Sequence, residues 1–419
     1  MNELTLFGGA RLSGEIGVHG AKNAALPILF SCLLFSEPVE LSNLPDITDV
    51  SAALSLLSSL GVKVTRTGRG RVVLDPSSAC SAGCDLSLSG ALRGSLYLLG
   101  ASSAHFPGLT VPRPGGCNFG ARPIDLHLSV FRAMGLTVSE SEEGVSLHGR
   151  PKGTIFHFPT VSVGATVNAI LTAVLAEGRT VLTGAAREPH VQDLIAFLRV
   201  AGARISLPAP GTVVIDGVMR LHGVSHRICP DMIEAGTYLL FAMATGGEIT
   251  LRAFPPGQLA SLLPLFSEMG ARIGEGVDSL CLSRTGKLRP VSVSTAPYPG
   301  FPTDLQPQLT ALACLAEGES AISDPIFPTR FGYVSELNRM GAKIVVRDGC
   351  AVVAGGARLT GRNVTAPDLR AGAALTLAAL AAEGESRIAR FDRIARGYAD
   401  YAENLTSLGA SVTLSDGGV

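Results

Sequence analysis

The sequence predicts an α/β fold built from six βαβαββ-like repeats, arranged as two domains of three repeats each. The first reason is a pattern that recurs about every 70 residues, in which an amphipathic helical stretch is followed by a glycine and then by residues of alternating polarity. The glycines that mark it are Gly61, Gly135, Gly202, Gly270, Gly341 and Gly409. The second reason is length, because 419 residues exceed the roughly 250–300 at which a single core stops growing.

The first copy shows what each element of a repeat is expected to be. Val50, Leu54 and Leu57 fall on one face of a helix. Gly61 suits the left-handed position that follows a helix, and residues 62–64 alternate as in a strand. The other copies have the same order, so each repeat should contribute an amphipathic helix followed by strands.

A second marker keeps the same step, because a turn residue ends a nearly all-apolar segment in each repeat. These turn residues are Pro38, Gly108, Gly178, Gly247, Gly318 and Gly384. Clear apolar segments span residues 24–35, 165–177, 237–245 and 371–382. A helix that is apolar on every side lies buried, so we expect one buried helix in each repeat, wrapped by the other elements.

Polar and charged residues gather at the starts of these apolar helices. They are Lys22 and Asn23; Arg93 and Ser95; Ser162; Asp231 and Glu234; Thr303 and Asp304; and Asp368 and Arg370. If rotation relates the repeats, the helices of a domain present their N-termini on one side, where dipoles and free amides favour anions. Arg122, Arg330 and Arg396 add positive charge, so phosphates or carboxylates are the expected ligands. Ordinary N-capping is the alternative for Ser162, Thr303, Asp304 and Asp368.

Cys117 lies in a stretch rich in proline and glycine, residues 112–127, with Arg113 and Arg122 on either side. A cysteine chosen for packing usually lies in an apolar periodic run, whereas this one lies among residues that break helices and strands. Nearby guanidinium groups favour the thiolate. We therefore interpret Cys117 as a reactive thiol, and a loop cysteine without chemistry is the alternative.

Composition excludes several classes of protein. The net charge is −1 and Trp is absent, which does not fit a nucleic-acid-binding surface. The longest apolar run, residues 24–35, is shorter than the roughly 20 residues of a membrane span, and no signal peptide is evident, so we expect a cytoplasmic protein. The eight cysteines are scattered and are expected to be free thiols; zinc at Cys80 and Cys84 is disfavoured because no second ligand pair accompanies them.

Seven motifs together resemble one family. They are GAKNAALP at 20–27, PGGC at 114–117, GARPIDLH at 120–127, VSVGAT at 161–166, AREP at 186–189, FPTDLQ at 301–306 and DLR at 368–370. With these motifs the chain resembles the UDP-N-acetylglucosamine 1-carboxyvinyltransferase (MurA) family of enolpyruvyl transferases over nearly its whole length. The resemblance implies an inside-out α/β barrel in each of two domains, residues 22–229 and residues 1–21 plus 230–419. It also implies an active site in the cleft between them, with hinges near residues 21 and 230.

The resemblance implies a reaction in which enolpyruvyl moves from phosphoenolpyruvate to the 3-hydroxyl of UDP-N-acetylglucosamine. Phosphate leaves through a tetrahedral adduct, and the reaction is the first committed step of peptidoglycan synthesis. Neither a cofactor nor a metal is implied, and we expect no nucleic-acid, membrane or obligatory protein partner. Such enzymes are targets of fosfomycin.

The resemblance also implies roles for individual residues. The catalytic residues would be Cys117, Asp304, Lys22 and Arg396. Phosphoenolpyruvate would be bound by Lys22, Asn23, Arg93, Arg122, Arg330, Arg370 and Arg396. UDP-N-acetylglucosamine would be bound by Asn23, Arg93, Arg122, Pro123, Ile124, Asp125, Leu126, Ser162, Val163, Gly164, Asp304 and Ile326, with Asp368 and Glu188 in support. Asp304 would be the base at the 3-hydroxyl, and Cys117 would act as acid, as nucleophile or in product release.

The sequence departs from the family pattern at Thr160, Met232, Pro328, Thr329 and Ala395. The last three precede Arg330 and Arg396, where carboxylates commonly fix guanidinium groups. Three alternatives stay open at this point: an enolpyruvyl transferase acting on shikimate 3-phosphate, a non-catalytic paralogue that binds the sugar nucleotide, and a repeat scaffold without a ligand.

Overall fold

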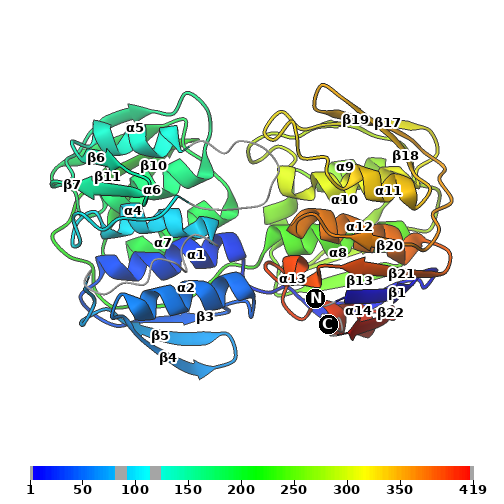
Figure 1. The fold of residues 1–419 in the computed structure, drawn as a ribbon, viewed down its shortest axis with the longest axis horizontal. Coiled ribbons are helices and arrows are strands. Elements are labelled where there is room, and N and C mark those ends of the chain that lie inside the picture. Colours follow the sequence, from blue (N-terminus) through cyan, green and yellow to red (C-terminus); the bar gives the residue numbers. More distant parts are fainter. Residues whose placement is uncertain (1–2, 81–91, 114–123, 416–419) are drawn as a thin grey trace. The chain divides into compact units, whose positions relative to one another are not determined.

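The computed structural model describes residues 3–80, 92–113 and 124–415 (Figure 1). These residues form two compact units. We call residues 3–19 with 230–415 unit 1, and residues 20–80, 92–113 and 124–229 unit 2.

The sheets of both units share one strand order. In unit 2, β12 (Ser225–Arg227) pairs parallel with β3 (Val39–Ser42), which pairs antiparallel with β5 (Arg71–Asp75), followed by β4 (Lys63–Gly68). The second sheet of unit 2 contains β8 (Ile155–His157), β9 (Arg179–Thr183), β11 (Thr212–Asp216) and β10 (Arg204–Ala209). A hairpin of β6 (Thr137–Glu140) and β7 (Val145–His148) lies in the second repeat of this unit.

Unit 1 repeats the same order three times. Its first sheet contains β2 (Ser13–Gly17), β13 (Glu248–Arg252), β15 (Ser279–Ser283) and β14 (Arg272–Glu275). Its second contains β16 (Ser292–Ser294), β17 (Glu319–Ser323), β19 (Cys350–Ala354) and β18 (Lys343–Arg347). Its third contains β20 (Asn363–Thr365), β21 (Glu385–Ala389), β1 (Glu3–Phe7) and β22 (Ser411–Ser415). The first strand of the chain therefore completes the last sheet, antiparallel to both β21 and β22.

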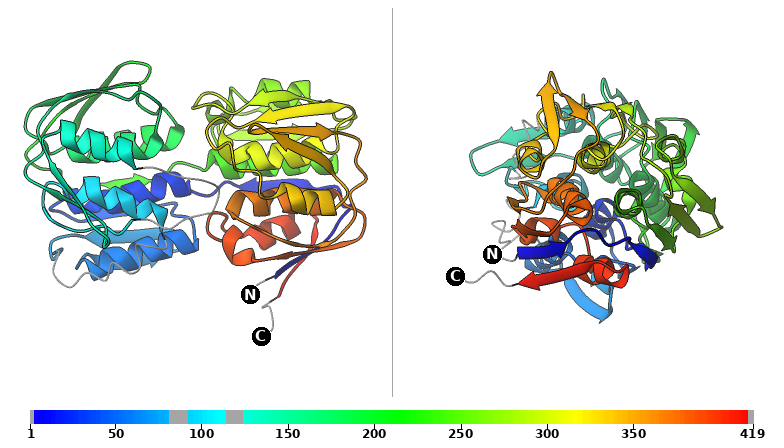
Figure 2. Two further views of the ribbon diagram at one scale, coloured as in Figure 1. Left: turned by 45° about the horizontal axis from the view of Figure 1, so that its top comes forward. Right: turned by 90° about the vertical axis from the view of Figure 1, so that its right-hand side faces the viewer.

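Each repeat places one apolar helix inside and shorter or amphipathic helices outside (Figure 2). The inner helices are α1 (Lys22–Ser31), α4 (Tyr97–Ser102), α6 (Val163–Ala173), α8 (Met232–Thr245), α10 (Gln306–Ala313) and α12 (Leu369–Ala381). The outer helices are α2 (Thr48–Ser59), α5 (Asp125–Ala133), α7 (Pro189–Val200), α9 (Leu263–Glu268), α11 (Val334–Arg339), α13 (Phe391–Ile394) and α14 (Tyr401–Ser407). Short 3₁₀ turns are η1 (Cys32–Leu34), η2 (Arg93–Leu96), η3 (Pro256–Leu259) and η4 (Thr303–Leu305). The predicted fold class, with helices inside and sheets outside, is confirmed.

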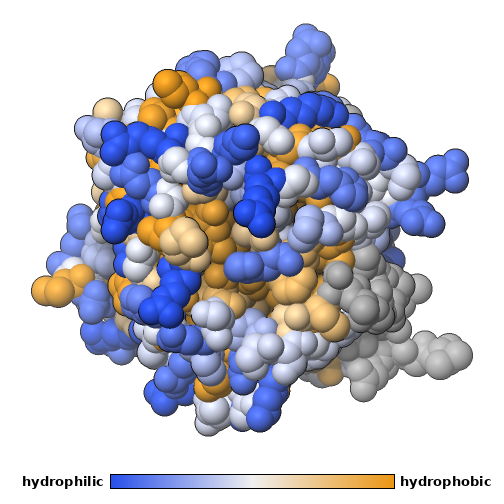
Figure 3. Space-filling view, turned by 90° about the vertical axis from the view of Figure 1, so that its left-hand side faces the viewer, coloured by the Kyte–Doolittle hydropathy of each residue, from blue (hydrophilic) through white to orange (hydrophobic). Residues whose placement is uncertain are grey.

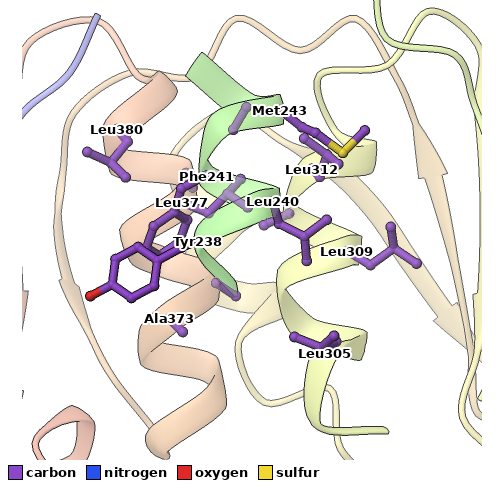
Figure 4. Close-up of a cluster of buried hydrophobic side chains, with 14 of the residues drawn as sticks. Tyr238, Leu240, Phe241, Met243, Leu305, Leu309, Leu312, Ala373, Leu377 and Leu380 are labelled. Atoms are coloured by element: carbon purple, nitrogen blue, oxygen red, sulfur yellow. The ribbon is translucent and has the colours of Figure 1, made fainter. Parts of the chain in front are cut away.

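The core of unit 1 lies between its three inner helices, α8, α10 and α12, which pack against one another (Figure 4). Phe241, Leu309 and Leu377 are fully buried there. Burial of each such side chain stabilises the fold by roughly 1.5–3 kcal/mol. Because the inner helices bury every face, their ends rather than their sides remain for polar chemistry.

The glycines that mark the repeats behave as the sequence predicts. Gly61, Gly135, Gly202, Gly270, Gly341 and Gly409 all have positive φ, between 79° and 111°. Only glycine adopts this conformation without strain, so it lets the chain turn from an outer helix into a strand. Helix ends were predicted less well: α6 stops at Ala173 instead of residue 177, and the first apolar segment changes to the 3₁₀ turn η1 after Ser31.

The described cysteines, at positions 32, 80, 229, 281, 314 and 350, are free thiols, as predicted. Over the same described ranges, we find no helix with the length and apolarity that a membrane span requires. Figure 3 shows one face of unit 2, where hydrophilic and hydrophobic residues are interspersed.

Candidate functional site

Asp304 of unit 1 is held between two buried arginines. It lies in η4, directly before the inner helix α10, and its side chain is 28% exposed. Its carboxylate accepts hydrogen bonds from Arg330 Nη1 at 2.8 Å and from Arg370 Nη2 at 3.0 Å. Both arginine side chains are less than 5% exposed. Asp304 therefore serves as the counter-ion of two guanidinium groups, and the N-capping alternative is wrong for this residue.

The charge of Asp304 follows from these contacts. Burial alone would raise the pKa of Asp304, but the charges and hydrogen bonds of Arg370 and Arg330 hold that pKa well below its ordinary value. For Arg370, burial alone would lower the pKa, but the charge of Asp304 raises the pKa above its ordinary value. All three groups are consequently charged near neutral pH, and together they carry one net positive charge.

The local sequence explains how Arg370 reaches this place. Asp368 caps α12 and accepts hydrogen bonds from the backbone N–H groups of Arg370 and Ala371, at 2.9 and 3.0 Å. The cap puts Arg370 in the first turn, where its guanidinium group lies 5.4 Å from the centre of the Tyr398 ring. Asp368 is therefore an N-cap, so the N-capping interpretation is confirmed for this residue, and this role sets the position of Arg370.

Arg330 is fixed although Pro328 and Thr329 precede it. Its Nη1 also donates to the backbone oxygen of Thr303 at 3.2 Å and to Thr303 Oγ1 at 3.1 Å. The guanidinium group lies 5.7 Å from the centre of the Phe327 ring. Thr303 and Asp304 thus hold the guanidinium group in place.

In unit 2, Lys22 is the first residue of the inner helix α1, and Asn23 is half-buried beside it. Lys22 Nζ lies 3.2 Å from Asp49 Oδ2, and the two side chains are 15% and 9% exposed. Asp49 belongs to the first turn of α2. The sequence reasoning missed Asp49, because an acidic residue in the first turn of a helix has an ordinary explanation.

The start of α6 forms a second polar region of unit 2. Ser162 is its N-cap and accepts a hydrogen bond from the Ala165 N–H at 3.3 Å. Val163 and Gly164 form the first turn. The ring of His127 lies so close to Gly164 that a Cβ there would be 2.9 Å from His127 Cε1. Free backbone N–H groups and an imidazole therefore meet at one helix N-terminus.

His127 is held as a neutral ring. Asn168 Nδ2 donates to His127 Nδ1 at 2.8 Å, so the proton of the neutral ring sits on Nε2. Asn168 is itself fixed, because it donates to the Leu96 oxygen and accepts from the Gly100 N–H. Burial, together with the charge of Arg93, lowers the pKa of His127 to about 4. His127 and Asn168 were missed by the sequence reasoning, since their partners are far apart in the chain.

The remaining predicted site residues fall into three groups. Asp125 is exposed at the start of α5, with Ile124 and Leu126 half-buried beside it. Half-buried positions are also taken by Arg93, by Glu188 at the start of α7 and by Arg396 after α13, whereas Ile326 is 37% exposed. Cys117, Arg122 and Pro123 lie outside the described residues.

His19 lies at the end of the first segment of unit 1, next to the point where the chain enters unit 2. Its Nδ1 lies 2.8 Å from Glu234 Oε1, and its Nε2 lies 3.1 Å from Asp400 Oδ2. Burial alone would lower the pKa of His19, but these two carboxylates raise it to about 9. Nothing in the sequence indicated this ion pair.

Comparison with known families agrees with the fold. The family described as EPSP synthase (3-phosphoshikimate 1-carboxyvinyltransferase) matches residues 6–405. The chain belongs to this family of enzymes, the enolpyruvyl transferases.

Individual relatives are more specific. The chain is 40% identical over 417 residues to a UDP-N-acetylglucosamine 1-carboxyvinyltransferase of Kosmotoga olearia, covering 98% of this chain and 99% of the relative. It is 41% identical over 413 residues to UDP-N-acetylglucosamine 1-carboxyvinyltransferase 2 of Geobacillus kaustophilus, covering 98% and 96%.

Two solved structures have the same fold as this chain. The enolpyruvyl transferase NikO from Streptomyces tendae is 29% identical, with a TM-score of 0.88 and coverage of 99% of both chains. An EPSP synthase from Acinetobacter baumannii shares the fold at 18% identity, with a TM-score of 0.74 over 99% of this chain and 100% of that one.

Proposed function

We propose that the protein transfers the enolpyruvyl group of phosphoenolpyruvate to the 3-hydroxyl of UDP-N-acetylglucosamine and releases phosphate. This is the first committed step of peptidoglycan synthesis, and we place it in the cytoplasm. The cluster of Asp304, Arg330 and Arg370 carries the proposal, because it combines a charged carboxylate with two buried cations. The two relatives at about 40% identity, both named for this activity, support the choice of acceptor.

Asp304 is proposed as the group that takes the proton of the 3-hydroxyl. In the free protein its carboxylate is charged, which is the form that accepts a proton, but Arg330 and Arg370 make it a weak base. An anionic substrate beside these arginines would offset their charge and raise the pKa of Asp304. The base would thus strengthen when phosphoenolpyruvate binds, before the acceptor is deprotonated.

The other charged groups are proposed to bind the anionic parts of the substrates. Lys22, Arg93, Arg122 and Arg396 would neutralise the carboxylate and phosphate of phosphoenolpyruvate. The amides of Ser162, Val163 and Gly164 at the start of α6 would bind the diphosphate, which suits a capped helix N-terminus. Asn23 would bind the amino sugar, and residues 122–126 the uridine. We propose that both regions belong to one active site between domains of residues 22–229 and 1–21 plus 230–419.

Cys117 is proposed as the group that protonates or covalently captures phosphoenolpyruvate. An epoxide such as fosfomycin should therefore alkylate this thiol, and faster when UDP-N-acetylglucosamine is present. The measurement is peptide mass spectrometry over a time course, with Cys350, a half-buried free thiol in β19, as the internal control. Alkylation of other cysteines, or an alkylation rate that does not change when UDP-N-acetylglucosamine is added, would contradict the assignment of Cys117 to the site.

Shikimate 3-phosphate is the rival acceptor, since the matching family carries its name. The thiol proposed to react at Cys117 and the identity to the two curated relatives favour the sugar nucleotide. The EPSP synthase structures are 18% identical, a level at which likeness concerns the fold alone. A non-catalytic paralogue would retain nucleotide binding without phosphate release.

A further inference from the structure

Asp324 is a buried carboxylate of unit 1 that lies behind the Asp304, Arg330 and Arg370 cluster. It follows β17 directly and is fully buried. Its Oδ1 accepts hydrogen bonds from Thr295 Oγ1, Ile326 N and Phe327 N at 2.7, 3.1 and 3.0 Å. Its Oδ2 accepts one from Thr303 Oγ1 at 2.6 Å. Four donors thus compensate the cost of burying this charge.

The bond to Asp324 decides which way the Thr303 hydroxyl points. A hydroxyl has one proton and two lone pairs, and Thr303 gives its proton to Asp324. Its lone pairs are therefore left for Arg330, whose Nη1 donates to Thr303 Oγ1 at 3.1 Å. The same Nη1 donates to Asp304 at 2.8 Å. A continuous chain of hydrogen bonds consequently runs from Asp324 through Thr303 and Arg330 to Asp304.

The same carboxylate also fixes the loop that follows it. The N–H groups of Ile326 and Phe327 both point to Asp324 Oδ1. Phe327 in turn supports Arg330, whose guanidinium group lies 5.7 Å from the ring centre. Ile326, at 37% exposure, is the residue proposed to contact the nucleotide. One buried side chain thus controls both the orientation of Arg330 and the position of Ile326.

We propose that Asp324 is a positioning residue for enolpyruvyl transfer, acting through Thr303 on the Arg330–Asp304 pair and through the backbone on Ile326. The inference rests on the proposed function. It assigns Asp324 no contact with substrate. Its role is to set the polarity of one hydroxyl and the course of one loop before substrate binds.

Replacing Asp324 by Asn tests this role with little change of shape. The Asn Oδ1 can keep the Thr295, Ile326 and Phe327 donors, so its Nδ2 faces Thr303. Thr303 must then accept from Asn and turn its own proton toward Arg330, which also donates. We expect kcat/KM to fall about 10- to 100-fold, the effect of losing a hydrogen bond to a charged group. Thr295→Val is the matched control: it removes a bond on the Oδ1 side, so it should lose stability but change kcat/KM less than about threefold.

A second pair of variants isolates the hydroxyl itself. Thr303→Ser keeps the relay and should stay within about threefold of the natural chain, whereas Thr303→Val should fall about tenfold or more. If Asp324→Asn does not fold, the comparison of Thr303→Ser with Thr303→Val still tests whether the Thr303 hydroxyl is needed. Equal activity of the Ser and Val variants, or an Asp324→Asn variant no weaker than Thr295→Val, would overturn the proposal. If the natural chain releases no phosphate with either acceptor, the proposed function has failed instead. Calorimetry with UDP-N-acetylglucosamine would then test Ile326 positioning, since Asp324→Ala, which removes the acceptor of the Ile326 and Phe327 N–H groups, should bind more weakly than Asp324→Asn, which keeps it. Equal affinity of these two variants would overturn that part of the proposal.

Discussion

Replacing His19 by Gln should destabilise unit 1 at neutral pH and have much less effect at pH 10. The His19 ring is clamped between Glu234 and Asp400, at 2.8 and 3.1 Å. The His19 side chain is 27% exposed, and that of Glu234 only 3%. Asp231, the N-cap of α8, is a further acidic group that faces Glu234. The perturbation thus removes the cation from a mostly buried acidic cluster.

The size and sign of the effect follow from the pKa of His19, which the two carboxylates raise from 6.5 to about 9. A group whose pKa is raised on folding stabilises fully below its unfolded pKa, and this stabilisation is lost as the pH rises through the folded pKa. This rise in the pKa of His19 corresponds to at most about 3 kcal/mol of folding free energy, at about 1.36 kcal/mol for each unit of pKa. Burial raises the pKa of Glu234, so keeping that carboxylate charged opposes part of the gain. We expect the variant to lose about 1–3 kcal/mol at pH 6.5–7.

Urea unfolding followed by circular dichroism measures this loss at pH 7 and pH 10. The quantity to compare is the difference between the natural chain and the His19→Gln variant, because ionisations common to both cancel. His222→Gln, at an exposed histidine outside the acidic cluster, is the control for the loss of an imidazole. A His19→Gln difference that stays constant or grows from pH 7 to pH 10 would refute the ion-pair reasoning. So would a His19 pKa near 6.5 in an NMR titration.

Two further predictions concern unit 2. Asp49→Asn should raise the KM for phosphoenolpyruvate about tenfold, because the Lys22 ammonium loses the carboxylate that positions it. Steady-state kinetics measures this, with Asp46→Asn at an exposed position as the control. An equal KM in the two variants would contradict the prediction. Gly164→Ala should weaken UDP-N-acetylglucosamine binding about tenfold or more, because a new Cβ would lie 2.9 Å from His127 Cε1. Unchanged affinity in calorimetry would show that the start of α6 does not bind the nucleotide.

The repeat architecture could be predicted from the sequence because its signals are local. Apolar residues on every face predict a buried helix, and the glycine after each outer helix requires positive φ whatever surrounds it. The N-cap roles of Ser162 and Asp368 are local in the same way. Helix ends depend on packing and capping partners, which explains why α6 ends earlier than its apolar run.

The hydrogen bonds and ion pairs of the site could not be predicted from the sequence, because they join residues that are far apart in the chain. Asp304 meets Arg330 and Arg370 across 26 and 66 positions, and His19 meets Glu234 and Asp400 across 215 and 381. The residue types around Asp304 allowed either an N-cap or a role in the substrate site, and the contacts with Arg330 and Arg370 appear only in the fold. The resemblance to a family supplied roles for substrate-facing residues, but not the polar groups behind them.

Phosphate release from phosphoenolpyruvate is the first measurement to make on the proposed transfer. The assay compares UDP-N-acetylglucosamine, shikimate 3-phosphate and no acceptor, with the Asp324→Asn and Thr295→Val variants run in parallel. We expect release that requires the sugar nucleotide. Release that requires shikimate 3-phosphate would contradict the proposed acceptor, and nucleotide binding without any release would contradict catalysis itself.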